Sequence, residues 1–148
     1  MASQVTQDQA HMLLRLYELR REPRLRQARE WFLREFYPKS LADRIALTPE
    51  QDTHVRMVTS YWDMAANFVR RGLVDEEMFL ENTAELWLVW DRLRPIANET
   101  REDSRDPQIW ENLERLAIRY ENWRERRAPG SLAALRERIE KARAAAKR

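Results

Sequence analysis

Histidine is a common metal ligand and proton carrier near neutral pH, and this sequence contains only His11 and His54. Glu50 and His54 are four residues apart close to an expected helix start, so their side chains would share one helix face. Di-metal helical bundles need Glu-x-x-His motifs on facing helices, and neither histidine follows a Glu at that spacing. We interpret Glu50 and His54 as a solvated pair and predict no metal ligand.

Carboxylates at helical spacing are the second set that acid–base chemistry would use. Three of them form an acidic ridge at steps of four: Glu77, Glu81 and Glu85. Asp63 has two interpretations, an Arg partner on a neighbouring helix that fixes the register, or a solvated face, which the charge pattern favours. We assign Asp63 a structural polar role together with Arg70 and Arg71, and predict no catalytic residue among them.

Other catalytic patterns are missing from the sequence. There is no Cys, so a thiolate nucleophile, a disulfide and a thiolate metal site are excluded. The two glycines, Gly72 and Gly130, stand alone and form no phosphate-binding loop. No Ser lies in a nucleophile-elbow pattern. The sequence therefore predicts a protein that is not an enzyme and needs no cofactor.

Arginines are dense in the first third of the chain and raise the question of nucleic acid. Acidic residues interleave with them, and many of these Arg have a Glu three or four residues away, which favours a salt-bridged surface. The Trp and Tyr residues fall mostly on apolar stripes instead of among the Arg. Nucleic-acid binding therefore stays the alternative. The arginines concerned are Arg15, Arg20, Arg21, Arg24, Arg26, Arg29 and Arg34.

Composition is typical of one helical domain. The chain has 148 residues, of which 43% are hydrophobic and 35% charged, with six Trp and two Gly. The net charge is +2, and residues 128–148 hold six basic against two acidic side chains. No apolar run is long enough to span a bilayer and no signal peptide opens the chain, so we expect a cytoplasmic protein.

Residues 48–97 organise the predicted fold as a central antiparallel αα-hairpin. Gly72 is suited to the left-handed position that ends a helix, and Asp75 is suited to cap the start of the next one. Apolar residues follow helical spacing on both sides of this corner, in the second arm as far as Ala97. Further helix starts are predicted at Thr6, Pro23 and Asp106. The expected fold is an all-α helical bundle of five or six helices.

A short linker at residues 128–130 precedes a basic C-terminal helix. This divides the chain into a bundle domain, 1–127, and a tail, 128–148. The tail carries an apolar seam of about two heptads, which is short for a coiled coil. It would pack on the bundle, pair with another copy or hang free, with the first two alternatives favoured equally. The interaction residues that we predict here are Leu132, Leu135, Ile139, Ala142, Arg136 and Arg143.

Five segments of the sequence carry a family resemblance: residues 23–30, 61–63, 69–76, 90–96 and 113–117. Together they resemble a group of small all-helical bacterial domains of unknown function. The resemblance spans most of residues 10–125, and it implies an all-helical fold and a bacterial origin. No activity is established for that group, so no catalytic residue is implied.

These observations leave two functional hypotheses of different classes. The first is a non-enzymatic interaction or scaffolding module that self-associates or binds a protein partner, which the tail seam suggests. The alternative is a nucleic-acid-associated basic helical protein, which the arginine clusters suggest.

Overall fold

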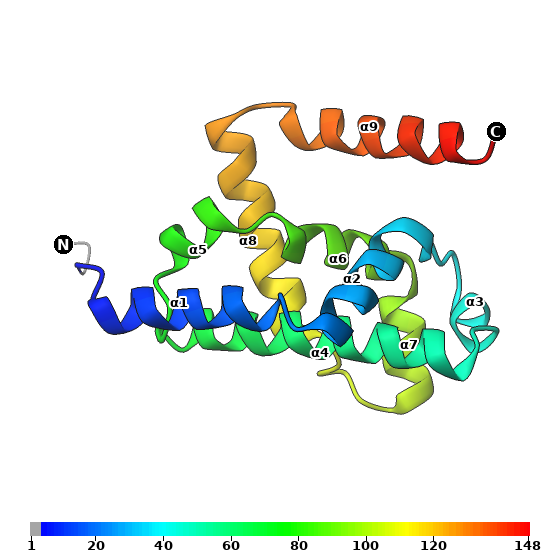
Figure 1. Ribbon diagram of the computed structural model, residues 1–148, viewed down its shortest axis with the longest axis horizontal. Helices are drawn as coiled ribbons and strands as arrows, with labels where there is room; N and C mark the ends of the chain where they lie inside the picture. Colours follow the sequence, from blue (N-terminus) through cyan, green and yellow to red (C-terminus); the bar gives the residue numbers. More distant parts are fainter. Residues whose placement is uncertain (1–3) are drawn as a thin grey trace.

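The computed structural model describes residues 4–148, and these form helices with no strand (Figure 1). The predicted all-α bundle is therefore confirmed. The elements are α1 (Gln7–Leu19), α2 (Pro23–Glu35), α3 (Leu41–Ile45), α4 (Pro49–Arg70), α5 (Glu76–Asn82), α6 (Glu85–Leu93), the 3₁₀ turn η1 (Arg94–Ile96), α7 (Ala97–Ser104), α8 (Glu111–Arg127) and α9 (Ser131–Ala146).

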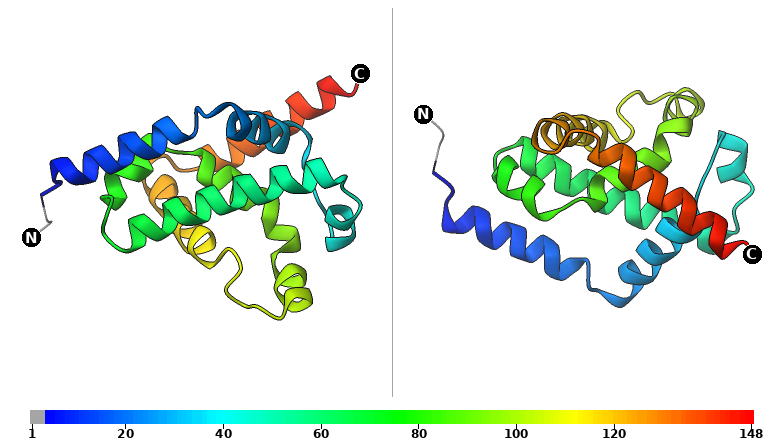
Figure 2. Two further views of the ribbon diagram at one scale, coloured as in Figure 1. Left: turned by 60° about the horizontal axis from the view of Figure 1, so that its bottom comes forward. Right: turned by 90° about the horizontal axis from the view of Figure 1, so that it is seen from above.

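Helix α4 runs through the middle of the molecule, with α2 and α8 as its main packing partners (Figure 2). The apolar stripe predicted on it is buried along its whole length, from Val55 through Trp62 to Val69. Two-sided packing explains why this helix also buries Tyr61 and Ala66, which lie off that stripe. The core of the protein therefore forms around α4.

The corner after α4 has the predicted geometry. Gly72 has a φ of 77°, and its N–H donates to the carbonyl of Val69 at 3.0 Å. The N–H of Leu73 donates to the carbonyl of Phe68 at 3.0 Å, which completes a Schellman motif. Asp75 then caps α5 by accepting from the N–H of Met78 at 3.0 Å.

The second arm of the hairpin is broken, which corrects the expectation of one helix reaching Ala97. Thr83 is extended, with φ −143° and ψ 110°, and separates α5 from α6. Pro95 then lies in η1, before α7 continues. The break lets α6 bury almost its whole circumference, including Trp87, Val89 and Leu93, among α2, α4 and α8. The described chain consequently contains more helices than the five or six expected.

Helix α8 begins later than predicted, because its N-terminus is capped from another helix. Asp106 closes only a local turn, in which its Oδ1 accepts from the N–H of Gln108 at 2.9 Å. The first turn of α8 is instead held by Asp63 of α4, whose Oδ1 accepts from the N–H of Leu113 at 3.0 Å. Asn112 also donates to Asp63, at 3.3 Å. Asp63 thus joins the two helices.

Arg70 and Arg71 belong to the same contact region between α4 and α8. Arg70 donates to the side-chain oxygen of Asn112. Arg71 donates through Nε to the side-chain oxygen of Asn67 at 3.2 Å, and Asn67 in turn donates to Asn112 at 3.4 Å. This network replaces the solvated face that the charge pattern favours for Asp63.

The two terminal helices lie against the bundle on limited faces. In α1, Leu16 is buried, whereas Leu14 and Tyr17 are exposed. In α9, Leu132 is buried and Leu135 packs against the core, so α9 packs on the body instead of hanging free. No helix in residues 4–148 combines the length and the apolar character that a membrane crossing requires.

Replacing Asp63 tests the cap of α8. We expect Asp63→Ala to lower the free energy of unfolding by about 1–2 kcal/mol, because a helix N-terminus loses its acceptor. Asp106→Ala is the matched control, and its cost should stay below about 0.5 kcal/mol because Asp106 is exposed. Urea unfolding followed by circular dichroism measures both values. Equal losses in the two variants would contradict the cap at Asp63.

Alkaline unfolding tests the bond between α4 and α1, in which the Tyr61 hydroxyl donates to the carbonyl of Leu16. Burial raises the pKa of Tyr61 from 10.0 to about 12, although Arg20 and Arg29 oppose the shift. Between these two values the unfolded state loses the phenol proton and the folded state keeps it, so stability falls as pH rises from 10 to 12.

Unfolding curves collected across that pH range measure the loss. Tyr61→Phe should remove part of the pH dependence, whereas Tyr17→Phe, at an exposed position of α1, should leave it unchanged. An identical pH dependence in Tyr61→Phe and the unaltered protein would show that Tyr61 is not the group responsible.

Candidate functional site

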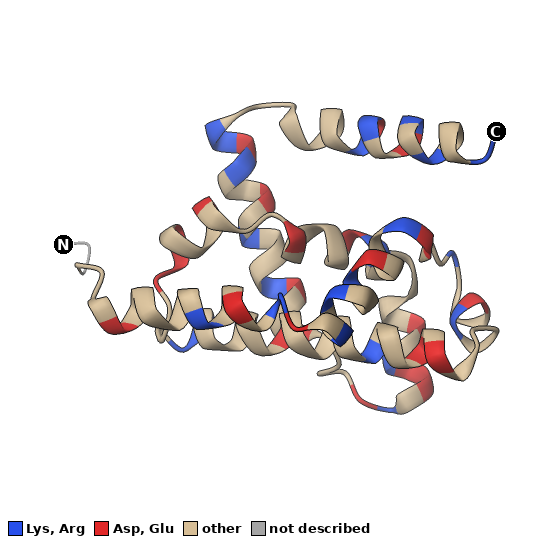
Figure 3. Cartoon of the chain, viewed as in Figure 1, with Lys and Arg blue, Asp and Glu red and all other residues tan. Residues whose placement is uncertain are grey.

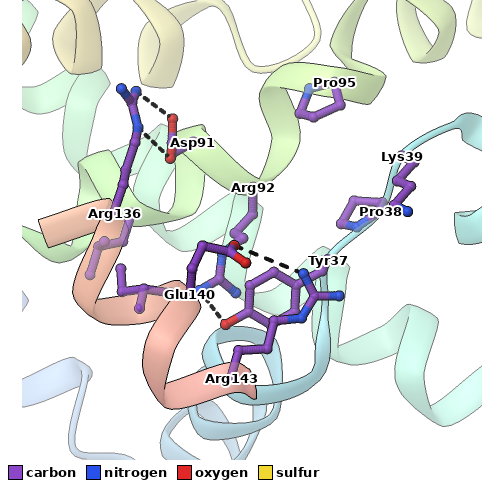
Figure 4. A pocket seen from close by; sticks show the side chains of 11 residues that line it. Tyr37, Pro38, Lys39, Asp91, Arg92, Pro95, Arg136, Glu140 and Arg143 are labelled. Carbon is purple, nitrogen blue, oxygen red and sulfur yellow. Dashed lines mark hydrogen bonds and ion pairs between the residues drawn. The ribbon is translucent and has the colours of Figure 1, made fainter. Parts of the chain in front are cut away.

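A cleft of about 290 Å³ lies between α9 and the body of the protein (Figure 4). Its walls come from three regions that are far apart in the sequence: the connection from α2 to α3, the C-terminal half of α6 with η1, and the middle of α9. The lining residues are Tyr37, Pro38, Lys39, Leu88, Asp91, Arg92, Pro95, Arg136, Ile139, Glu140 and Arg143.

Arg92 anchors this cleft by capping the C-terminus of α2. Its Nη1 donates to the carbonyls of Leu33 at 2.9 Å and Phe36 at 3.2 Å, with a longer contact to Phe32 at 3.4 Å. The last carbonyls of a helix have no partner within the helix, so a cation here satisfies both the hydrogen bonds and the helix dipole. Burial lowers the pKa of Arg92, but an Arg still keeps its proton at neutral pH.

Tyr37 connects Arg92 to α9. Its hydroxyl accepts from Nη2 of Arg92 at 2.9 Å and donates to the carbonyl of Leu33 at 3.3 Å. The guanidinium carbons of Arg92 and Arg143 lie 3.7 and 3.9 Å from the centre of its ring. Both are within the range of cation–π attraction, so one aromatic ring holds two cations, one from the body and one from α9.

A second contact fixes the middle of α9. Arg136 pairs with Asp91 through two hydrogen bonds, at 2.9 and 3.2 Å, and its guanidinium carbon lies 5.0 Å from the centre of the Trp87 ring. The hydrogen bond to Asp91 raises the pKa of Arg136. Trp87 itself donates through Nε1 to Glu121 of α8 at 2.8 Å. Because Arg136 binds both of its carboxylate oxygens, Asp91 is largely engaged by α9.

The cleft carries a surplus of positive charge. Four of its lining residues are cationic and two are acidic, which gives a net charge of +2. Arg143 lies near Glu140 at 4.0 Å, and Lys39 is exposed with no ion pair in residues 4–148. Leu88, Ile139 and two prolines supply apolar surface beside these charges. Such a site suits the recognition of an anionic group attached to an apolar one. Its guanidinium groups keep their protons, so they do not act as bases.

The predicted interaction residues are only partly gathered here. Arg136, Ile139 and Arg143 line the cleft. Leu132 and Leu135 pack against the core instead, and Ala142 is exposed. Asp63, Arg70 and Arg71 lie in the network between α4 and α8, away from the cleft.

The sequence analysis missed Tyr37, Asp91 and Arg92 as parts of a site. Tyr37 lies in no sequence pattern that predicts a site, and the segment 90–96 is distinguished in the sequence only by the family resemblance. No local spacing indicates that Arg92 reaches the end of α2, which is more than fifty residues earlier in the chain.

His54, the histidine considered as a metal ligand, lies outside the cleft. The ring of His54 packs on Trp31, with 5.6 Å between ring centres, and its buried Nδ1 has no hydrogen-bond partner in the described residues. Residues 4–148 contain no group of three or more acidic or histidine side chains placed to hold a metal ion.

These features define a helical bundle with a cationic cleft under its last helix. Residues 5–120 match the family model described as Domain of unknown function (DUF4760), which covers well over half of the chain, so the protein belongs to that family. Comparison with curated proteins and with solved structures gave no match in either case. The match confirms the predicted resemblance to a family of unknown function, and it ends before α9.

Replacing Arg92 tests its structural role. We expect Arg92→Met to lower the free energy of unfolding by about 2–4 kcal/mol, because several carbonyls and the Tyr37 hydroxyl lose their donor. Arg94→Met is the matched control: its side chain is 41% exposed, pairs with two carboxylates and lies 6.0 Å from the centre of the Trp90 ring, so its cost should stay below about 1 kcal/mol. Denaturant unfolding of both variants supplies the comparison, and similar losses would show that Arg92 is not the cap of α2.

Proposed function

We propose that this protein is a non-enzymatic interaction module, and that its cleft binds an acidic, partly apolar segment of a protein partner. The observation that carries the proposal is the charge surplus of the cleft, in which four cations surround apolar surface with two carboxylates. A segment that alternates acidic and apolar residues would match both features. A bacterial, cytoplasmic setting, predicted from the sequence, stays part of this proposal.

The engagement of the polar groups supports a binding role over a catalytic one. Arg92 is occupied by the end of α2, and Asp91 is occupied by Arg136. Lys39 and Arg143, by contrast, face the cleft with weak or no ion pairs, so they are the groups available to a ligand. Asp91 holds α9 and Arg92 holds the end of α2, whereas Lys39 and Arg143 would supply recognition, Arg143 in addition to its contact with the Tyr37 ring.

Self-association through the tail is less well supported than a partner in the cleft. The seam predicted for pairing is turned partly toward the body, since Leu132 is buried and Leu135 packs on the core. Pairing of two tails would therefore require α9 to leave its own bundle and lose the contacts of Arg136 and Arg143.

Nucleic-acid binding has weaker support than the sequence alone suggests. Arg20 and Arg29 are largely buried in an ion cluster with Glu85, and Arg15 and Arg26 pair with glutamates on their own helices. Basic side chains outnumber acidic ones along α9, whereas both signs alternate over the body (Figure 3). Residues 4–148 therefore show no continuous basic stripe of the kind that follows a phosphate backbone.

A labelled peptide that alternates Glu and Leu tests the proposal by fluorescence anisotropy. We expect saturable binding that weakens with salt, and a loss of about tenfold or more in affinity for Lys39→Glu and for Arg143→Glu. Lys147→Glu, at the end of α9 and outside the cleft, is the matched control and should change affinity less than about twofold. A peptide that alternates Lys and Leu should not bind.

Three outcomes would overturn the proposal. One is the absence of binding by the Glu–Leu peptide at low salt, and another is equal binding by the cleft variants and Lys147→Glu. The third comes from light scattering: a dimer for the intact chain and a monomer for a chain ending at Arg127 would favour self-association instead. Titration with labelled DNA and RNA, with a steep salt slope, would favour the nucleic-acid alternative.

A further inference from the structure

A second cavity, of about 250 Å³, lies between α1, α4 and the C-terminal end of α5, just before the start of α6. Its walls are mainly apolar and aromatic. They include Leu13, Leu14 and Tyr17 of α1, Trp62 of α4 and Phe79 of α5. Leu14 and Tyr17 are 59% and 55% exposed, so the cavity opens to solvent along α1. No part of the proposed function uses this cavity.

One end of this cavity carries an uncompensated positive charge. Arg20, which lines it, and Arg29 both bind the same carboxylate oxygen of Glu85, at 3.2 and 2.8 Å. The Glu85 side chain is 9% exposed and the two Arg side chains are 18% and 17% exposed. Two cations therefore share one anion in a largely buried place. A further negative charge close to Arg20 would be stabilised there.

Two buried donors at the same place have no acceptor in the described residues. One is Nε–H of Arg20, and the other is Nε1–H of Trp62, a side chain only 1% exposed. The guanidinium carbon of Arg20 lies 5.2 Å from the centre of the Trp62 ring, so the two side chains that carry these donors pack together. A buried donor that lacks an acceptor is destabilising, and an acceptor group from a ligand would supply the missing hydrogen bond.

We propose that this cavity binds a small amphipathic carboxylate, a molecule with one carboxylate and an apolar chain of moderate length. The carboxylate lies beside Arg20 and Trp62, and the chain lies along Leu13, Leu14 and Phe79. A single negative charge balances the surplus of the Arg20–Arg29–Glu85 cluster, and two oxygens match two donors. The doubly charged phosphate of a monoester would overcompensate the cluster.

Calorimetric titration of the intact protein with decanoate is the direct test. We expect one saturable site, with decanoate binding about tenfold or more tightly than decanol, which has the same chain without the charge. Acetate, which has the charge without the chain, should not bind measurably. The preference for decanoate over decanol should fall below about twofold in Arg20→Met. That variant leaves Arg29 and Glu85 as a one-to-one pair, so the fold should persist.

A substitution at the rim separates the cavity from other apolar surface. Leu14→Glu places a negative charge at the exposed edge and should weaken decanoate binding about tenfold or more. Ile45→Glu is the matched control, because Ile45 is 74% exposed on α3 and does not line the cavity. Both positions are exposed, so circular dichroism should show unchanged helix content in both variants.

Four results would overturn the inference. They are no heat of binding with decanoate at millimolar concentration, equal affinity for decanoate and decanol, equal binding by Leu14→Glu and Ile45→Glu, and a dimer of the intact protein that Leu14→Glu dissociates. The last result would assign the cavity to a second copy of the chain. Loss of decanoate binding would leave the peptide experiment on the α9 cleft unaffected, because the two sites share no lining residue.

Discussion

The carboxylate of Glu85 is the constraint on which the packing of this bundle depends. A charge at this depth is tolerated only when it is paired, and Glu85 is paired twice, with Arg20 at the end of α1 and with Arg29 of α2. Arg29 also donates to the carbonyl of Arg20 at 2.9 Å, so the turn between α1 and α2 is tied to the start of α6. The break of the helix at Thr83 makes this possible, because it separates Glu85 from the exposed Glu77 and Glu81.

The other end of α6 also carries a buried charge that is paired, and there the charge is positive. Arg92 is a largely buried cation that takes its partners from the carbonyls at the end of α2 and from Tyr37. Helix α2 is thus fixed to α6 at two places, in its middle, where Arg29 binds Glu85, and at its C-terminal end, which Arg92 caps. Because α2 and α6 also pack against α4, these polar contacts set the register of an interface whose free energy comes mainly from apolar burial.

Sequence reasoning succeeded where a structural feature depends on residues close together in the chain. The end of α4 at Gly72 and the starts of helices after Thr6, Thr48 and Asp75 each rest on hydrogen bonds that span a few residues, so their signals are local. It failed where the start or end of a helix depends on a residue far away in the chain. Apolar spacing continues through Thr83 although the helix stops, and the cap of α8 is Asp63, fifty residues away. The candidate sites depend on such distant contacts, so only their α9 residues were predicted.

The two cavities show why the net charge of the chain does not indicate the charge of its cavities. The chain carries only +2 overall, yet each cavity holds a local surplus of cations. These surpluses lie toward opposite ends of α6, where Glu85 and Arg92 are seven residues, or about 10 Å, apart. Acidic side chains elsewhere on the body offset them at long range, where salt screens the interaction. In both proposals, an anion would therefore be attracted only within contact distance, so a ligand that also carries an apolar part to hold it there would be favoured.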